Sequence, residues 1–136
     1  MTGKVWIDIE GTRITDGERE PVKETASGEY YKRNGKHYII GSRDGGFLKR
    51  MKLAENSLTI IRNDAGSQMV FEKGEKSRVF YDTPGGSLTL EIRTHRFGWR
   101  EGEDCLDITM EYSLYHGDSR ISDSSMKVRI YPQQEP

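Results

Sequence analysis

Two cations and three hydroxyl-bearing side chains of this 136-residue chain could together bind an anion. Lys49 and Arg62 carry the positive charges, Ser67 and Thr83 carry aliphatic hydroxyls, and Tyr81 carries a phenol. An arginine can hold a carboxylate or phosphate through two parallel hydrogen bonds, and a lysine adds a compact charge. If the fold gathers these five residues on one face, they predict a site for a small amphipathic or anionic ligand.

A second stretch with possible chemistry is FYDTPGGSLTLEIRT over residues 80–94, where a glycine pair precedes a serine. A phosphate-binding loop needs a helix after it, so that the helix N-terminus faces the anion. Residues 87–94 instead alternate between apolar and polar, as a strand does, and the Gly-Lys-Ser/Thr ending of a P-loop is missing. Pro84, Gly85 and Gly86 therefore predict a tight hairpin turn.

The remaining reactive side chains do not form a recognisable catalytic or metal-binding set. Under the register expected below, His95 and His116 are about ten residues apart along paired strands, which is roughly 30 Å. His37 completes the histidines, and all three are expected at the surface or rim. Cys105 has no nearby base that would make it a nucleophile. We predict no catalytic residue, no metal and no cofactor.

The elements that must position these residues are strands. Leu106, Ile108, Met110, Tyr112 and Leu114 alternate with polar residues over 105–116, and this pattern is typical of a half-buried strand. Turn residues recur about every 8–12 positions, and no segment has a convincing helical period. The sequence predicts one antiparallel β-barrel of eight to ten strands over residues 1–132, followed by a polar tail over 133–136. A β-sandwich is the alternative.

The turns also predict which residues face each other. Hairpins centred on 55–56, 64–65 and 74–75 keep the apolar residues of every strand in one phase, which a one-residue slip would destroy. One predicted row contains Met51, Ile60, Met69 and Tyr81, and the next contains Leu53, Leu58, Phe71 and Val79. Further turns at 84–86 and 100–101 would add Leu90 and Met110 to that second row.

The last strand fits this register only with an extra residue. Ile121 would face Leu114, yet Met126, Val128 and Ile130 have the opposite parity. We therefore expect a β-bulge within 123–125. The predicted core contains Met69, Phe71, Val79, Leu90, Ile108 and Met110.

In the same register Lys49 faces Arg62 in the inward phase, with Ser67 and Thr83 continuing the row. Like charges directly opposite each other are destabilising, and buried charges need partners, so the pair predicts an anion site at a barrel mouth. The alternative is that both side chains reach water at a strand end, or that Glu24 or Asp64 neutralises them.

Residues 67–74 (SQMVFEKG) and 79–94 (VFYDTPGGSLTLEIRT) resemble the central motif of the YwiB-like bacterial family, a domain of unknown function. Residues 27–40 (SGEYYKRNGKHYII) are also similar to segments of that family. The resemblance covers nearly the whole chain and implies a lipocalin-like barrel of the calycin type, without an established activity. The segment GSRDGG over 41–46 departs from the acidic, tyrosine-containing segment of similar proteins.

Composition limits the function classes. Charged residues make up 32% of the chain, yet the formal net charge is only −1, which disfavours a nucleic-acid or membrane surface as partner. No stretch approaches 18 consecutive apolar residues, and the first residues lack the apolar run of a signal peptide. With a single cysteine the chain suits a reducing compartment. We expect a cytoplasmic monomer or homodimer.

Three classes of function remain. The first is a non-enzymatic module that binds a small amphipathic or anionic ligand in the barrel, an expectation that rests on fold analogy. The second is a protein-interaction or assembly module that uses Trp6, Tyr115 and Tyr131, which fall outside the apolar phase. The third is an enzyme with a dispersed site. A single-stranded nucleic-acid face over the basic and aromatic stretches 31–36 and 94–100 is a weaker alternative.

Overall fold

Each alternating stretch of the sequence forms a strand in the computed structural model of the protein. The structure describes residues 1–41, 49–62 and 67–134, and at 49, 62, 67 and 81–83 it describes the backbone alone. The strands are β1 Gly3–Thr15, β2 Glu18–Arg33, β3 Lys36–Gly41, β4 Lys49–Leu53, β5 Ser57–Arg62, β6 Ser67–Glu72, β7 Lys76–Thr83, β8 Gly86–Glu101, β9 Leu106–His116 and β10 Ser119–Pro132. No helix occurs among the described residues, so the predicted all-β fold is confirmed.

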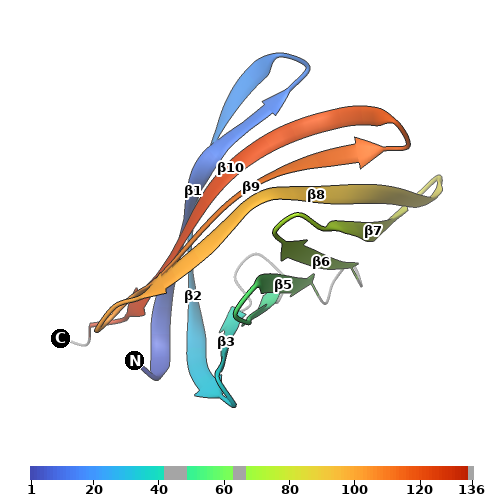
Figure 1. Ribbon diagram of the computed structural model, residues 1–136. Helices are drawn as coiled ribbons and strands as arrows, with labels where there is room; N and C mark the ends of the chain where they lie inside the picture. Colours follow the sequence, from blue (N-terminus) through green and yellow to red (C-terminus); the bar gives the residue numbers. More distant parts are fainter. Residues whose placement is uncertain (42–48, 63–66, 135–136) are drawn as a thin grey trace.

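The ten strands form one antiparallel sheet that curls into a nearly closed barrel (Figure 1). Its order is β6-β5-β4-β3-β2-β1-β10-β9-β8-β7, so the first and last strands of the chain pair in its middle. That pairing runs from Val5 opposite Pro132 to Thr15 opposite Ser122. The two edges of the sheet are β6 and β7, and the barrel is incomplete between them.

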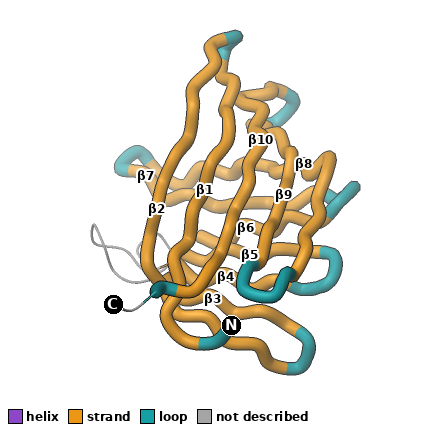
Figure 2. Tube along the Cα trace, turned by 90° about the vertical axis from the view of Figure 1, so that its left-hand side faces the viewer, coloured by secondary structure: helices purple, strands orange, loops and turns teal. Residues whose placement is uncertain are grey.

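The barrel has a long-stranded side and a short-stranded side. Strands β1, β2, β8, β9 and β10 have 11 to 16 residues each, whereas β3 to β7 have 5 to 8. Figure 2 shows the long strands crossing in front of the short ones at a steep angle. The apolar core therefore lies between two layers whose strands run in different directions.

Two hairpin turns of the structure use Asp-Gly and Asn-Gly pairs, which favour such turns. Asp16-Gly17 and Asn34-Gly35 both have positive φ at each residue, the conformation of the two-residue turns that match strand twist. The glycine pair of the 80–94 stretch also lies in a turn, because Thr83 pairs with Gly86 and β8 follows directly. A hairpin turn, and not a phosphate-binding loop, is confirmed there.

Most of the predicted register on the short-stranded side is confirmed. Met51 faces Ile60, and Ile60 faces Met69. In the next row Leu53 faces Leu58, which in turn faces Phe71. These rows stop at β6, because β6 and β7 are opposite edges of the sheet and the hairpin expected between them is not formed.

On the long-stranded side, one predicted turn and one predicted bulge were misplaced. The β8–β9 hairpin does not turn at 100–101: Glu101 faces Leu106, and Met110 therefore faces Phe97 and not Leu90. The bulge of β10 lies between Arg120 and Ser122, earlier than the predicted 123–125, so Ser122 takes the place opposite Leu114. A bulge that the sequence did not predict interrupts β8 between Thr94 and Arg96.

The core contains five of the six residues predicted for it. Phe71, Val79, Leu90, Ile108 and Met110 are at most 9% exposed, and Met69 is partly buried against them. The aromatic member packs across the barrel, since the ring of Phe71 on β6 lies 4.7 Å from that of Tyr112 on β9.

Replacing Phe71 by alanine should lower the free energy of unfolding by about 3–5 kcal/mol, because a buried ring is lost and a cavity is left. Phe80 on β7 is 60% exposed, so Phe80→Ala is a matched control that should change stability by less than about 0.5 kcal/mol. Urea unfolding of both variants measures the difference. A loss below 1 kcal/mol for Phe71→Ala would contradict this core.

Candidate functional site

The inward-facing residues of β10 change character along the strand. Met126, Val128 and Ile130 are buried and apolar, as a core position requires. Ser122 and Ser124 continue the same alternation toward the start of β10 and are only 4% and 5% exposed. The chain thus places two hydroxyls where the strand pattern calls for apolar side chains.

Neighbouring strands extend this polar region. Tyr112 on β9 faces Ser124 on β10, and Thr94 on β8 faces the other side of Tyr112. Thr94 is 3% exposed. Because Tyr112 packs on Phe71 across the barrel, these residues face the interior. We call Thr94, Ser122 and Ser124 the inner hydroxyls.

The inner hydroxyls have no hydrogen-bond partner in the part of the chain that the structure describes. A buried hydroxyl without a partner costs roughly 1–3 kcal/mol, and native proteins keep few such groups. Three of them on the inner face of two strands, two facing Tyr112 and one facing Leu114, therefore call for an explanation. Since a hydroxyl both donates and accepts, the group can bind a polar molecule of either kind.

A cation stands beside the inner hydroxyls. Arg13 on β1 faces Ser124 directly, so both side chains leave the sheet on the same side. Arg13 is half-buried and makes no hydrogen bond or ion pair with any described residue. Its guanidinium is therefore available to an anionic group next to the hydroxyls.

For the predicted anion site, the structure describes only the backbone and the pairing of its strands. Lys49 faces Arg62, and Arg62 faces Ser67, in the predicted register. Thr83 pairs with Gly86 on the edge strand β7, so it is not a hydrogen-bonded neighbour of Ser67. The side chains of Lys49, Arg62, Ser67, Thr83 and Tyr81 lie outside the described residues, and their site stays a prediction.

The prediction that all three histidines lie at the surface or rim was wrong for His37. This side chain is 1% exposed, its Nδ1 lies 2.5 Å from the hydroxyl of Tyr30, and the ring of Trp99 meets it edge-on. A neutral imidazole with its own proton on Nε2 can accept a hydrogen bond from the tyrosine hydroxyl at Nδ1. Burial lowers the pKa of His37 and raises that of Tyr30, so both groups are neutral in the fold.

The aromatic residues outside the apolar phase have different surroundings. Trp6 is 39% exposed and borders a concavity of about 440 Å³ with Ile40. Tyr131 donates a hydrogen bond to Asp8 at 3.0 Å, which raises the pKa of the tyrosine. Tyr115 lies under the guanidinium of Arg93, 3.8 Å from its ring centre.

Other reactive groups show no arrangement for chemistry. The thiol of Cys105 lies 3.9 Å from a carboxylate oxygen of Asp107. No histidine makes a hydrogen bond to this thiol in the described part of the chain. Within the described ranges, no three His, Cys, Asp or Glu side chains gather as metal ligands. The described residues also include no helix that could cross a membrane.

The fold and the inner hydroxyls define a small β-barrel protein with a partly polar interior. The chain belongs to the family described as Domain of unknown function (DUF1934), whose model matches residues 7–128. Its fold is similar to the crystal structure of ywiB protein from Bacillus subtilis, with a TM-score of 0.83 and 18% sequence identity. The similarity covers 97% of this chain and 93% of that one. No curated protein matches the sequence.

Sequence reasoning missed the inward position of Ser122 and Ser124 because it misplaced the bulge of β10. With the bulge at 123–125, Ser122 and Ser124 fall outside the inward phase of β10. The observed bulge after Arg120 moves both inward. The only signal was the run of small polar residues before Met126, which fits a bulge on either side.

The buried His37 should make the protein sensitive to acid. The unfolded chain takes up a proton near the ordinary pKa of 6.5, before the folded chain does, because the folded-state pKa is lower. The free energy of unfolding should therefore fall as the pH drops below about 6.5, until the folded-state pKa is passed. This free energy should be lower at pH 5.5 than at pH 7.5.

The matched control replaces both partners by apolar residues, as in the Tyr30→Phe, His37→Leu double variant, because one change alone would leave the other polar group buried and unpaired. Urea unfolding at both pH values compares the two proteins. His95 and His116 are present in both proteins. An equal loss in wild type and variant would show that His37 is not the acid-sensitive group.

Proposed function

We propose that this protein is a non-enzymatic binding module for a small amphipathic anion held inside the barrel. The observation that carries the proposal is the set of three buried hydroxyls without partners among the described residues, two of which face Tyr112 from neighbouring strands. Arg13 beside Ser124 supplies the charge for the anionic group. Phe71, Tyr112 and Met126 supply apolar surface for the rest of the ligand.

The energetic argument separates a binding role from a structural one. Unpaired buried hydroxyls destabilise the empty protein, and a barrel that only had to fold would gain by replacing them with apolar groups. Residues that break such a rule are expected where function requires them. A ligand that pairs with these hydroxyls stabilises the native state, and it does so more strongly as its free concentration rises above its dissociation constant.

The predicted pair Lys49 and Arg62 is a second position for the anionic group within the same proposal. Their facing register supports it, since two like charges directly opposite repel each other until an anion binds. An Arg62→Met, Lys49→Met double variant tells the two positions apart, because it leaves Arg13 in place.

The alternative proposal is a protein-interaction module that uses the exposed Trp6. Its support is that one large aromatic side chain remains 39% exposed in the midst of the sheet. This surface and the inner hydroxyls involve different residues, so variants of one leave the other unchanged.

The Thr94→Val, Ser124→Ala double variant should have two opposite effects. Without ligand it should be more stable than wild type by about 1 kcal/mol or more for each hydroxyl removed, because the unpaired groups are gone. Decanoate, used as a probe, should raise the melting temperature of wild type and should do so much less in the variant. Urea unfolding and thermal unfolding measure the two effects.

Ser125→Ala is the matched control, since the next residue of β10 is exposed and faces the other side of the sheet. Decanol has the same chain without the charge and should bind more weakly. The proposal fails if decanoate stabilises the double variant as much as wild type, or if removing the hydroxyls destabilises the empty protein.

A further inference from the structure

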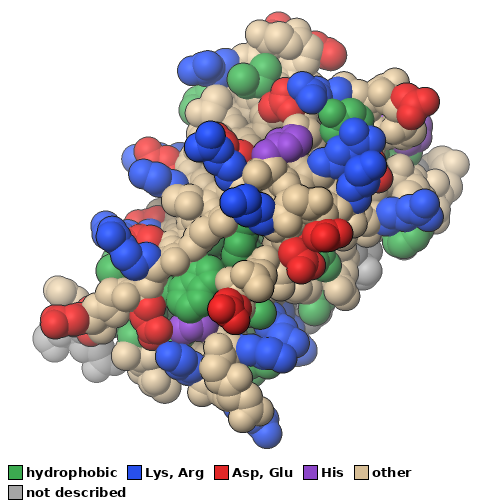
Figure 3. Space-filling model, viewed as in Figure 1, with side chains coloured by type: hydrophobic (Ala, Val, Ile, Leu, Met, Phe, Trp, Pro, Cys, Tyr) green, Lys and Arg blue, Asp and Glu red, His purple; other side chains and the backbone are tan. Residues whose placement is uncertain are grey.

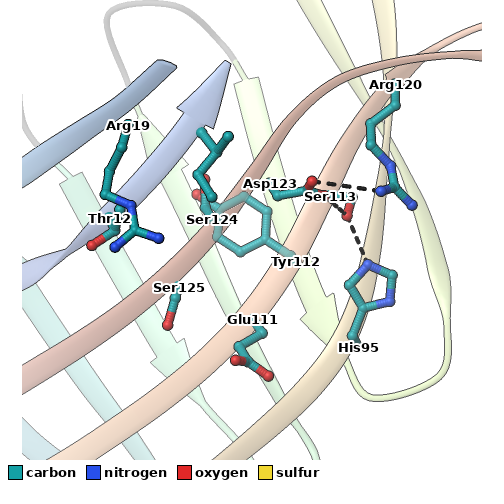
Figure 4. Close-up of a pocket in the computed structure, with 11 residues that line it drawn as sticks. Thr12, Arg19, His95, Glu111, Tyr112, Ser113, Arg120, Asp123, Ser124 and Ser125 are labelled. Carbon is teal, nitrogen blue, oxygen red and sulfur yellow. Dashed lines mark hydrogen bonds and ion pairs between the residues drawn. The ribbon is translucent and has the colours of Figure 1, made fainter. Parts of the chain in front are cut away.

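The outer face of the long strands is hollowed beside the inner site. A concavity of about 500 Å³ is lined by side chains of β1, β2, β8, β9 and β10, and Figure 4 shows them converging from both sides. Thr12 and Ser125 form part of its floor, with Arg19 on one wall and His95 and Arg120 on the other. The side chains of Ser125 and Asp123 have the opposite phase to Ser124 and leave the sheet on its other face, while Tyr112 and Ser124 also line the concavity.

Both bulges of the long strands occur at this concavity. His95 is the extra residue of the β8 bulge, between Thr94 and Arg96. Arg120 directly precedes the extra residue of the β10 bulge, Ile121. A bulge turns a side chain out of the regular alternation, and bulges are frequent beside functional sites. The β8 bulge places His95 at this concavity, and the β10 bulge directly follows Arg120, which also lines it.

A hydrogen-bonded chain holds the wall of His95 and Arg120 in place. The buried Ser113 hydroxyl donates to Asp123 at 2.5 Å and lies 2.7 Å from Nε2 of His95, whose N–H it can accept. Arg120 lies 3.5 Å from the other oxygen of Asp123 and donates twice to the hydroxyl of Tyr115. The serine proton points to the aspartate, which differs from a nucleophile activated by histidine. The chain therefore positions His95 and Arg120 for binding.

The charges of the lining leave one cation uncompensated. Glu111 is paired with Arg96 at 3.1 Å, and Asp123 is paired with Arg120. Arg19, on the opposite wall, makes no ion pair or hydrogen bond with any described residue. Figure 3 shows both signs of charge interspersed over this face of the molecule, so attraction of an anion depends on the local arrangement and not on net charge.

We propose that this outer concavity binds a small phosphorylated polyol. The fork of Arg19 matches a phosphate group through two hydrogen bonds, and Arg120 lies on the opposite wall as a second guanidinium. The hydroxyls of Thr12 and Ser125 and the carboxylate of Glu111 can exchange hydrogen bonds with the hydroxyls of a polyol. The volume lies within the range of small-molecule sites.

Nuclear magnetic resonance titration with glucose 6-phosphate tests the proposal in the full-length protein. Wild type should show saturable backbone amide shifts at the residues that line the concavity. Arg19→Gln should weaken binding at least tenfold, and because Arg19 is exposed the variant should keep the wild-type spectrum elsewhere. Arg33→Gln removes an exposed arginine at the other end of the same strand and should change affinity less than twofold.

Three results would overturn the proposal. The first is the absence of saturable shifts in wild type, and the second is an equal loss of affinity in Arg19→Gln and Arg33→Gln. The third is equally tight binding of a part of the probe. If inorganic phosphate binds as tightly as glucose 6-phosphate, the sugar hydroxyls play no role, and if glucose does, the phosphate group plays none. Thr94→Val should bind the probe like wild type, because its side chain faces the barrel interior; loss of binding there would show that the two sites are one.

Discussion

The pairing of β1 with β10 is the interaction on which the rest of the barrel depends. Every other strand pair joins neighbours along the chain, whereas this one joins residues more than a hundred positions apart. Without it the chain would form a six-stranded and a four-stranded sheet, each with an uncovered apolar face. The continuous pairing from Val5 to Thr15 fixes the phase of both halves at once, because a slip of one residue would turn every side chain over.

The same constraint gives the long strands two distinct faces with different chemistry. Residues with the phase of Tyr112 enter the interior, where apolar side chains give way to Thr94, Ser122 and Ser124. Residues with the phase of Ser113 line the outer concavity, where Ser113, Asp123 and Glu111 have hydrogen-bond or ion-pair partners. Several polar side chains on the outer face are thus paired although water can reach that face. The three hydroxyls on the inner face, where water is excluded, have no partner among the described residues. The interior is thus the place where the fold gives up stability.

Regular features were predictable from the sequence, and irregular ones were not. Alternation and turn residues were enough to predict eight to ten antiparallel strands and the facing of Met51 with Ile60, because each two-residue turn leaves one register. The bulges at His95 and Ile121 leave no such mark, since an extra residue among polar neighbours does not disturb the apolar pattern. Both candidate sites lie at these bulges, so the sequence showed their residues without showing which way they face. His37 was misjudged because a histidine between lysine and tyrosine in an edge-like stretch shows no sign of burial.

Native mass spectrometry of the protein purified from the organism that encodes it tests the central claim most directly. The account predicts that wild type carries a small anionic molecule in addition to its 15.6 kDa chain, and that the Thr94→Val, Ser124→Ala variant, purified in the same way, does not. The same spectrum reports whether the chain is a monomer or an assembly, which separates ligand binding from an assembly role of Trp6. A wild-type protein without any bound molecule, or an equal adduct on both proteins, would contradict a binding role for the inner hydroxyls.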